Sequence, residues 1–261
     1  MINNLESIIK NNYNFNIISI LKNEESTDGN VYNIKTDNSK YIIKIYSDID
    51  KVNSMVELHN YLKDMYIPKI IKTKNNTSYI QYNDKYIIIY SFLEGKQLHE
   101  YLTNNIYPKE LVKDIAIEVR RLHDLTLNKS FNLETVVFAS NLDRKSVLHF
   151  DLTKGNIFIN KGIGFIDFDD AKYGDSICDV SILLSLLFVS KKRGIDNESI
   201  RIFLENYYKE NEVELRNKEL PYIKKYMNNW IDYLLNNNQF ESSLKESFEF
   251  KKESINKIDL L

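Results

Sequence analysis

Two carboxylates and one amide lie close together in the stretch HFDLTKGNIFINKGIGFIDFDDA, which runs from His149 to Ala171. These three side chains belong to Asp151, Asn156 and Asp167. Hard oxygen donors of this kind hold Mg²⁺, which takes few protein ligands and binds substrate phosphates as well. The residue types therefore indicate a carboxylate-amide-carboxylate cluster suited to a metal and a phosphate group.

Two short apolar runs must position this cluster. The runs NIFIN and GIGFIDF are predicted to be strands, joined by Lys161-Gly162 in the pattern of a hairpin. Asp151 and Asn156 precede the first strand and Asp167 ends the second, so a tight hairpin brings all three to one end. The alternative interpretation is that they are turn residues, because Asx side chains favour turns.

The order of the polar residues is similar to that of kinases. The spacing H-x-D-x-x-x-x-N, followed by I-D-F, resembles a kinase catalytic loop and its metal-binding aspartate. The fuller stretch LHFDLTKGNIFI…GFIDFDDAKYGDSICDV resembles the aminoglycoside phosphotransferase and choline kinase-like family. Members typically carry H-G-D-x-x-x-x-N, then I-D-[FW], then G-D-x-x-x-D before an apolar helix. The resemblance is specific over residues 148–179 and weaker over residues 26–95.

The resemblance implies a role for each matching residue. Asp151 would orient and partly deprotonate the attacking hydroxyl group, and Asn156 and Asp167 would hold Mg²⁺ on the nucleotide phosphates. Lys44, in YIIKIY, matches the strand lysine that pairs with the α- and β-phosphates. Glu57 is the only acid in the interior of the helix expected next, so it is the natural ion-pair partner of Lys44.

The family pattern also implies where the nucleotide base of ATP or GTP would lie. The run IIIYSFLEG matches the hinge between the two lobes, where the backbone of Ser91 and Leu93 would meet the adenine edge. Phe158 and Ile166 would form the floor of the base pocket. The turn STDGN, residues 26–30, would cover the phosphates, although no G-x-G-x-x-G precedes Lys44.

Two departures from protein kinases concern the acceptor. Phe150 follows His149 where protein kinases have arginine and this family usually has glycine. Only seven residues separate Asp167 from Asp175, where a helix is expected to start, and no A-P-E follows. This leaves no room for an activation segment, so a small-molecule acceptor is favoured over a protein.

Several polar residues near the cluster have structural interpretations. His149 is expected to bond to backbone near Asp167 rather than to carry a proton. Asp175 is expected to cap the following helix, and Asp179 to lie in its first turn, where acids are favoured. The family interpretation, that the two brace the catalytic loop, is also structural. His123 is expected to pack against that loop.

In the first part of the chain, apolar and polar residues alternate as they do in the strands of a sheet, and one helix interrupts these strands. Asp50 is expected to cap this helix, and Pro68 to stop it. The predicted strands are residues 15–22, 30–36, 40–47, 78–83 and 85–92, the first three forming an antiparallel meander, and the predicted helix is 48–65.

The chain beyond Gly95 is expected to be mainly helical. Pro108 is placed near the first turn of its first helix. The predicted helices are residues 108–125, 176–190, 199–209, 220–235 and 242–255. This order of elements, together with the family resemblance, implies an α+β, two-lobed protein-kinase-like fold, with an N-terminal nucleotide-binding lobe over residues 1–92 and a C-terminal catalytic and acceptor-binding helical lobe over residues 93–261.

The acceptor pocket is expected in the helical part after Ser190, where acids would suit a polycationic aminoglycoside and aromatic residues a choline-like amine. The aromatic residues fall at helical spacing, so core packing is the better interpretation for Tyr222, Tyr226, Trp230 and Tyr233. The sequence does not choose between these acceptors.

The composition of the chain limits the classes of partner that it is expected to bind. The formal net charge of -2 gives no basic excess for nucleic acid or a membrane surface, and we expect neither as a partner. The longest apolar stretch, residues 180–190, is shorter than the roughly 20 residues that span a bilayer. No signal peptide is expected at the start. Cys178 is expected to be a core residue, and a single cysteine suits the reducing cytoplasm.

These observations predict a cytoplasmic ATP- or GTP- and Mg²⁺-dependent kinase of a small-molecule hydroxyl group, monomeric or homodimeric. The acceptor would be aminoglycoside-like, or else a metabolite such as choline, ethanolamine, homoserine or a sugar. A non-catalytic kinase-like protein, such as a spore-coat or scaffold member, is the alternative from another class. The presence of Lys44, Asp151, Asn156 and Asp167 argues against it.

Overall fold

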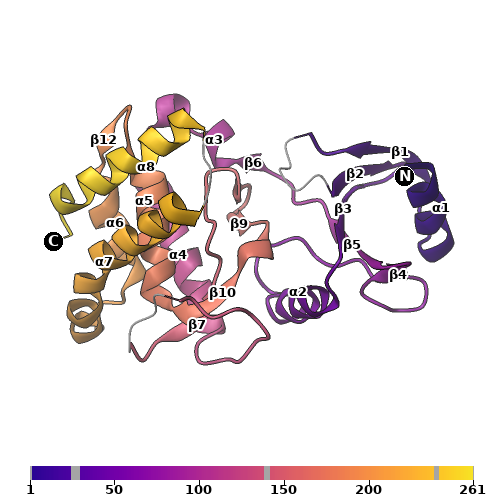
Figure 1. The fold of residues 1–261 in the computed structure, drawn as a ribbon, viewed down its shortest axis with the longest axis horizontal. Helices are drawn as coiled ribbons and strands as arrows, with labels where there is room; N and C mark the ends of the chain where they lie inside the picture. Colours follow the sequence, from indigo (N-terminus) through magenta and orange to yellow (C-terminus); the bar gives the residue numbers. More distant parts are fainter. Residues whose placement is uncertain (1, 25–29, 138–141, 238–240, 261) are drawn as a thin grey trace. The chain divides into compact units, whose positions relative to one another are not determined.

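The computed structural model describes residues 2–24, 30–137, 142–237 and 241–260. The chain forms two compact units, Met1–Glu94 and Gly95–Leu261 (Figure 1). The first contains an antiparallel sheet and the second is mostly helical, which is the α+β organisation predicted.

The sheet of the first unit has the strand order β1-β2-β3-β5-β4, and every neighbouring pair is antiparallel. The expected meander of three strands is therefore confirmed. The bounds are β1 Ile17–Lys22, β2 Val31–Thr36, β3 Lys40–Tyr46, β4 Ile80–Tyr82 and β5 Lys85–Ser91.

A helix that the sequence analysis did not predict, α1 (Ile2–Asn12), completes this unit. Leu5 and Ile9 lie one helical turn apart, and both are buried in one cluster with the sheet residues Ile34, Ile43 and Ile89. Burial of such side chains is worth about 1.5–3 kcal/mol each, so contact with the sheet stabilises a short helix that would be marginal alone.

The second helix, α2 (Ile49–Tyr61), begins and ends differently from the prediction. Asp48 is its N-cap, because its carboxylate accepts a hydrogen bond from the backbone N–H of Asp50 at 2.9 Å. The expected cap, Asp50, therefore lies inside the first turn. The helix ends at Leu62, and the residues before Pro68 form turns, so Pro68 is not what stops it.

The second unit contains the five predicted helices with shifted ends, together with a short helix, α3 (Leu98–Tyr101), that was not predicted. The bounds of the five are α4 Lys109–Leu125, α5 Ser176–Phe188, α6 Asn197–Tyr207, α7 Val213–Asn237 and α8 Ser242–Ser254. Pro108 takes the N-cap position of α4 rather than its first turn. The largest difference is α7, which begins seven residues before the predicted start at Leu220 and continues through Pro221.

Short strands complete the second unit. A three-stranded sheet has the order β6-β8-β9, and β10 pairs with β7, a pair that the sequence analysis did not predict. A small hairpin pairs β11 with β12. The bounds are β6 Lys96–Gln97, β7 Lys145–Leu148, β8 Ile157–Ile159, β9 Ile163–Phe165, β10 Lys172–Asp175, β11 Val189–Ser190 and β12 Gly194–Ile195.

Helix α5 forms the core of the second unit, and nearly every one of its side chains is buried. Cys178 is 1% exposed, so the expectation of a core thiol is confirmed. Tyr226 and Trp230 of α7 are also buried, whereas Tyr233 is 44% exposed, so the expected core packing holds for only part of that aromatic row. No helix in the described part of the chain is both long and apolar enough to cross a membrane.

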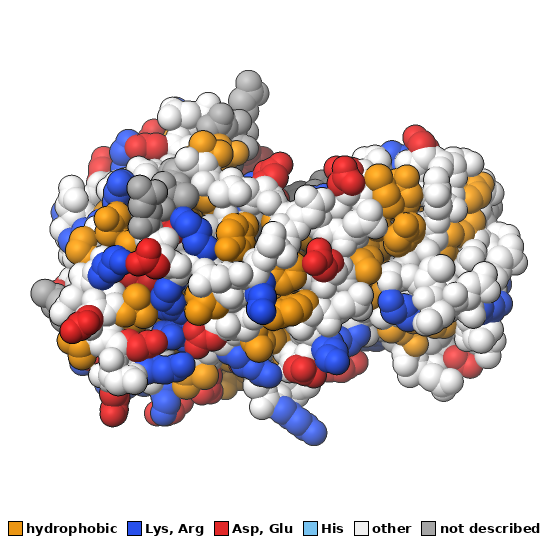
Figure 2. Space-filling view, turned by 90° about the horizontal axis from the view of Figure 1, so that it is seen from below, with side chains coloured by type: hydrophobic (Ala, Val, Ile, Leu, Met, Phe, Trp, Pro, Cys, Tyr) orange, Lys and Arg blue, Asp and Glu red, His pale blue; other side chains and the backbone are white. Residues whose placement is uncertain are grey.

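Charged side chains of both signs are interspersed on the face of the second unit seen in Figure 2. Exposed ion pairs in the second unit include Lys191 with Glu246 and Lys252 with Asp232. This pattern agrees with a chain whose formal net charge is only -2.

Candidate active site

The predicted hairpin is present and places the polar residues at one end. Strands β8 and β9 pair antiparallel, with Ile157 opposite Phe165, and the backbone N–H of Asn160 donates to the carbonyl oxygen of Gly162 at the turn. At the open end, the N–H of Ile166 donates to the carbonyl oxygen of Asn156 at 3.0 Å. The residues just before β8 and just after β9 are therefore neighbours.

Asn156 holds the carboxylate of Asp151. Its side-chain nitrogen donates to Oδ2 of Asp151 at 2.7 Å and to the backbone oxygen of Asp151 at 2.9 Å. The loop between them is tightened by a 2.9 Å bond from the N–H of Thr153 to the carbonyl oxygen of Asp151. Since the amide nitrogen of Asn156 is engaged, its oxygen Oδ1 is the atom left for a cation.

Asp167 lies two residues beyond the end of β9, in the left-handed backbone region with φ 66°. It is close enough to Asp151 for charge repulsion to matter. Burial, and then the charges of Asp170 and Asp167, raise the pKa of Asp151 to about 6. The structure therefore brings Asp151, Asn156 and Asp167 together. It adds Asp170, a third carboxylate that the sequence analysis did not assign to the site.

The donor set fits a hard divalent cation. A cation among these carboxylates would relieve the repulsion that raises the pKa of Asp151. Among the described residues, no group of three or more His, Cys, Asp or Glu side chains could hold a metal by itself. Mg²⁺ typically binds through one or two carboxylates together with substrate phosphates and water.

His149 has the structural role that was expected. The side chain is fully buried, and Nε2 donates to the carbonyl oxygen of Ile166 at 2.8 Å, next to Asp167. Burial lowers the pKa of His149, so the imidazole is neutral, and no partner of its Nδ1 is found within the described ranges. His149 therefore ties the catalytic loop to the end of β9.

Asp179 braces the backbone on either side of His149. Its Oδ2 accepts from the N–H of His149 at 2.9 Å, and its Oδ1 accepts from the N–H of Phe150 at 2.8 Å. Phe150 has φ 67°, a left-handed conformation that non-glycine residues rarely adopt. Burial alone would raise the pKa of Asp179, but the hydrogen bond from His123 lowers it, so the carboxylate is ionised.

Asp175 occupies the N-cap position of α5, but its side chain does not make the expected cap. Its carboxylate instead accepts from Nζ of Lys145 at 2.7 Å and from the hydroxyl group of Tyr226. Those bonds link β7, β10 and α7. His123 is fully buried and contacts Asp179, which in turn accepts from the backbone of His149 and Phe150, so direct packing of His123 against the loop stays a prediction.

The predicted nucleotide-binding residues lie on both units. Lys44 is half-buried on β3, and Glu57 is exposed on α2. The N–H of Ser91 already donates to the carbonyl oxygen of Lys69 at 2.8 Å, so a contact to a base would use the carbonyl of Ser91. Leu93 is buried.

In the second unit, Phe158 is buried on β8 and Ile166 is half-buried after β9. The turn predicted to cover the phosphates, residues 26–30, lies outside the described residues except for Asn30.

Comparison with known proteins agrees with the resemblance read from the motifs. The model of the phosphotransferase enzyme family matches residues 131–210, which include the whole specific stretch 148–179. No curated protein matches the sequence.

Solved structures match over nearly the whole chain. A microcompartment-associated aminopropanol kinase has a TM-score of 0.69 at 12% identity, covering 97% of this chain and 95% of its own. An amicoumacin kinase in complex with AMP-PNP, Ca²⁺ and Ami has a TM-score of 0.68 at 16% identity, with 98% and 96% covered. The choline kinase of Streptococcus pneumoniae has a TM-score of 0.64 at 14% identity, with 98% of both chains covered. These similarities confirm the predicted fold.

Proposed function

We propose that this chain, whose residues 131–210 match the phosphotransferase enzyme family, transfers the γ-phosphate of ATP or GTP to a hydroxyl group of a small molecule. The observation that carries the proposal is the contact between Asp151 and Asn156 at the open end of the β8–β9 hairpin, beside Asp167. The fold alone supports many functions, so the site and not the fold supports this particular one.

Asp151 is the residue that accepts the proton of the acceptor hydroxyl. Burial is the largest cause of its raised pKa, and burial keeps the Asp151 carboxylate more basic than an ordinary aspartate even when a cation offsets the charges of Asp167 and Asp170. The hydrogen bond from Asn156 fixes which carboxylate oxygen remains available. Phosphoryl transfer needs positioning and charge neutralisation more than covalent help, and this arrangement supplies positioning.

Asn156 and Asp167 would hold Mg²⁺ through their side-chain oxygens. The ion would neutralise charge on the nucleotide phosphates. The remaining assignments are proposals that follow the family pattern: Lys44 for the phosphates, Glu57 as its partner, Ser91 and Leu93 for the base edge, and Phe158 and Ile166 for the base face.

The acceptor is a small molecule rather than a protein. The seven residues between Asp167 and Asp175 form a short 3-10 turn, Phe168–Asp170, and then strand β10, so they offer no platform for a peptide. The acceptor is aminoglycoside-like, or else a metabolite of the choline, ethanolamine, homoserine or sugar class. The similar solved structures include an amicoumacin kinase, an aminopropanol kinase and a choline kinase.

Two measurements test the proposal. Mg²⁺ together with ATP or GTP is expected to raise the melting temperature of the chain, and an acceptor screen that follows nucleotide consumption is expected to identify the acceptor. Asp151→Asn is expected to abolish turnover while nucleotide binding stays largely intact. Asp143→Asn is the matched control, because Asp143 is exposed and contacts only Lys218 among the described ion pairs.

The outcomes separate the alternatives. If neither nucleotide with Mg²⁺ changes the melting temperature, the nucleotide-binding part of the proposal is wrong. If nucleotide binds but no acceptor or water consumes it, the chain is a non-catalytic member of the fold. Unchanged turnover in Asp151→Asn would show that Asp151 is not the base.

A further inference from the structure

Three fully buried polar side chains from three helices form a continuous series of hydrogen bonds behind the catalytic loop. Tyr207 ends α6, His123 lies in α4 and Asp179 in α5. The Tyr207 hydroxyl lies 2.8 Å from Nδ1 of His123, and Nε2 of His123 lies 3.2 Å from Oδ2 of Asp179. Each of the three side chains is at most 1% exposed, so water does not compete for these contacts.

The protonation states determine the direction of each hydrogen bond. Asp179 is ionised and can only accept, so Nε2 of His123 carries the proton that lies between them. Burial lowers the pKa of His123, which keeps the ring neutral with a single N–H. Nδ1 must therefore accept, and the Tyr207 hydroxyl donates to it. Burial raises the pKa of Tyr207, so this hydroxyl keeps its proton.

The series of hydrogen bonds ends at the backbone of Phe150. The Asp179 carboxylate accepts from the N–H of Phe150, whose φ of 67° is unfavourable for a residue with a Cβ by roughly 1–2 kcal/mol. Phe150 directly precedes Asp151, so its backbone conformation determines where the carboxylate of Asp151 points. A glycine would adopt this conformation without the penalty.

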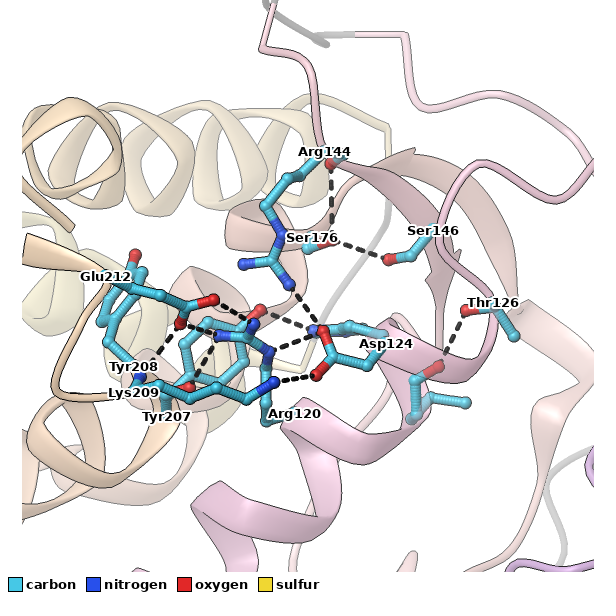
Figure 3. A network of polar contacts seen from close by, with 12 residues as sticks. Arg120, Asp124, Thr126, Arg144, Ser146, Ser176, Tyr207, Tyr208, Lys209 and Glu212 are labelled. Atoms are coloured by element: carbon cyan, nitrogen blue, oxygen red, sulfur yellow. Dashed lines mark hydrogen bonds and ion pairs between the residues drawn. The ribbon is translucent and has the colours of Figure 1, made fainter. Parts of the chain in front are cut away.

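Tyr207 is itself held in place by the network in Figure 3. Its carbonyl oxygen accepts from Nη1 of Arg120 at 3.1 Å, and the guanidinium carbon of Arg120 lies 5.5 Å from the centre of its ring. The ring also stacks on Phe203, with 6.1 Å between centres. The hydroxyl group is therefore delivered to His123 from a fixed position.

We propose that Tyr207 is a positioning residue. Its hydroxyl selects the tautomer of His123 that donates to Asp179. Asp179 then holds Phe150 in its left-handed conformation, directly before the catalytic Asp151. This inference rests on the proposed kinase function for its activity readout. Without the Tyr207 hydroxyl, the other tautomer of His123 becomes available. In that tautomer Nε2 has no proton to donate to Asp179.

The first test is Tyr207→Phe, which removes one oxygen atom and keeps the ring. We expect kcat for ATP turnover with Mg²⁺, measured with water as acceptor or with an acceptor found by screening, to fall about tenfold. The KM for ATP is expected to stay unchanged, because no nucleotide contact is lost. Tyr208→Phe is the control: this neighbouring hydroxyl is also buried, but it donates to Glu219 at 2.8 Å. It is expected to reduce stability and leave kcat unchanged.

The second test is suppression by glycine. In a Phe150→Gly background the backbone no longer needs to be held in a strained conformation. Tyr207→Phe is then expected to lower kcat by less than about threefold relative to Phe150→Gly alone. An equal tenfold loss in both backgrounds would overturn the link to Phe150. A loss of kcat in Tyr208→Phe equal to that in Tyr207→Phe would show a general structural effect instead.

A third readout does not depend on activity. Nitrogen-15 NMR of histidine-labelled protein distinguishes the two neutral tautomers, and loss of a signal in His123→Gln assigns it among the four histidines. We expect the Nε2–H form in the native chain and in Tyr208→Phe, and a mixture in Tyr207→Phe. An unchanged tautomer in Tyr207→Phe would overturn the inference even if the chain proves to be a kinase. A chain without turnover would instead overturn the proposed function.

Discussion

The guanidinium group of Arg120 and the carboxylate of Glu212 form two parallel hydrogen bonds of 2.6 Å each. Arg120 belongs to α4, and Glu212 directly precedes α7 (Figure 3). The Nε of Arg120 also donates to Asp124 at 2.7 Å. Planar bidentate pairs of this kind are among the strongest charge-assisted contacts. This pair ties the beginning of α7 to the helix that carries His123.

Glu212→Gln is expected to lower the free energy of unfolding by about 2 kcal/mol. The change leaves the buried Arg120 with only part of its charge compensated, and breaking a buried pair from one side is costly. Urea denaturation measures the difference. Glu205→Gln is the control, because Glu205 pairs with Arg201 on an exposed helix face and is expected to contribute less than about 1 kcal/mol. Equal losses would contradict the importance of the buried pair.

Lys251 of α8 is buried against the end of α5. Its ammonium group donates to the carbonyl oxygens of Ser185 and Val189. The last carbonyls of a helix have no partner within the helix and favour a cation. Burial, and then repulsion from Lys154, lower the pKa of Lys251 from 10.5 to about 8.

Comparison of the native chain with Lys251→Met is expected to show that the contribution of Lys251 to the free energy of unfolding rises with pH. The contribution of a lysine in a stabilising ion pair would fall instead. Between pH 8 and 10.5 the unfolded chain binds a proton at this lysine that the folded chain has released, so native stability rises with pH. The stability difference between native chain and variant should shift in favour of the native chain by at most about 1.4 kcal/mol per pH unit. Lys245→Met, at an exposed site, should show no such slope. A difference that falls with pH would contradict the assignment.

Gly95 stands at the start of the second unit with φ 125°, a conformation that side chains rarely adopt. A Cβ there would lie 2.6 Å from the carbonyl oxygen of Ile159 on β8. Gly95→Ala is therefore expected to lower the melting temperature by an amount that corresponds to about 2 kcal/mol or more. Gly162→Ala has open space around it and is expected to stay within about 0.5 kcal/mol. Equal melting temperatures for the two variants would contradict this account.

The local parts of the site could be predicted because they depend on short stretches. The β8–β9 hairpin follows from a turn between two apolar runs, and its closure brings Asp151, Asn156 and Asp167 together. The contact by which Asp179 holds the catalytic loop could be predicted only from the family resemblance. The atoms of Asp179 that accept from His149 and Phe150 come from 30 and 29 residues away, and no local rule gives such a contact.

The contacts behind the loop could not be predicted for the same reason. Tyr207 and His123 are 84 residues apart in the sequence. Helix α1 was missed because its stability comes from packing on the sheet rather than from its own short sequence. The N-cap of α2 was misplaced by two residues, since Asp48 and Asp50 are both good caps and the choice between them depends on the backbone of Asp48.

Asp167 and Asp170 both lie close enough to raise the pKa of Asp151, and they differ in their relation to the hairpin. Asp167 directly follows the Ile166 backbone that pairs with Asn156, whereas Asp170 ends the next turn. Asp167→Asn is therefore expected to raise the Mg²⁺ concentration needed for half-maximal ATP turnover by about tenfold or more, because a carboxylate ligand is replaced by a neutral amide.

Asp170→Asn is the matched comparison, since it removes the same charge three residues further along the chain. We expect it to change the Mg²⁺ requirement by less than about threefold, because in the proposed site Asp170 contributes charge to the field around Asp151 without ligating the ion. Titration of Mg²⁺ at saturating ATP measures both variants. A larger effect of Asp170→Asn than of Asp167→Asn would transfer the ligand role to Asp170, and equal small effects would remove the metal from this end of the hairpin.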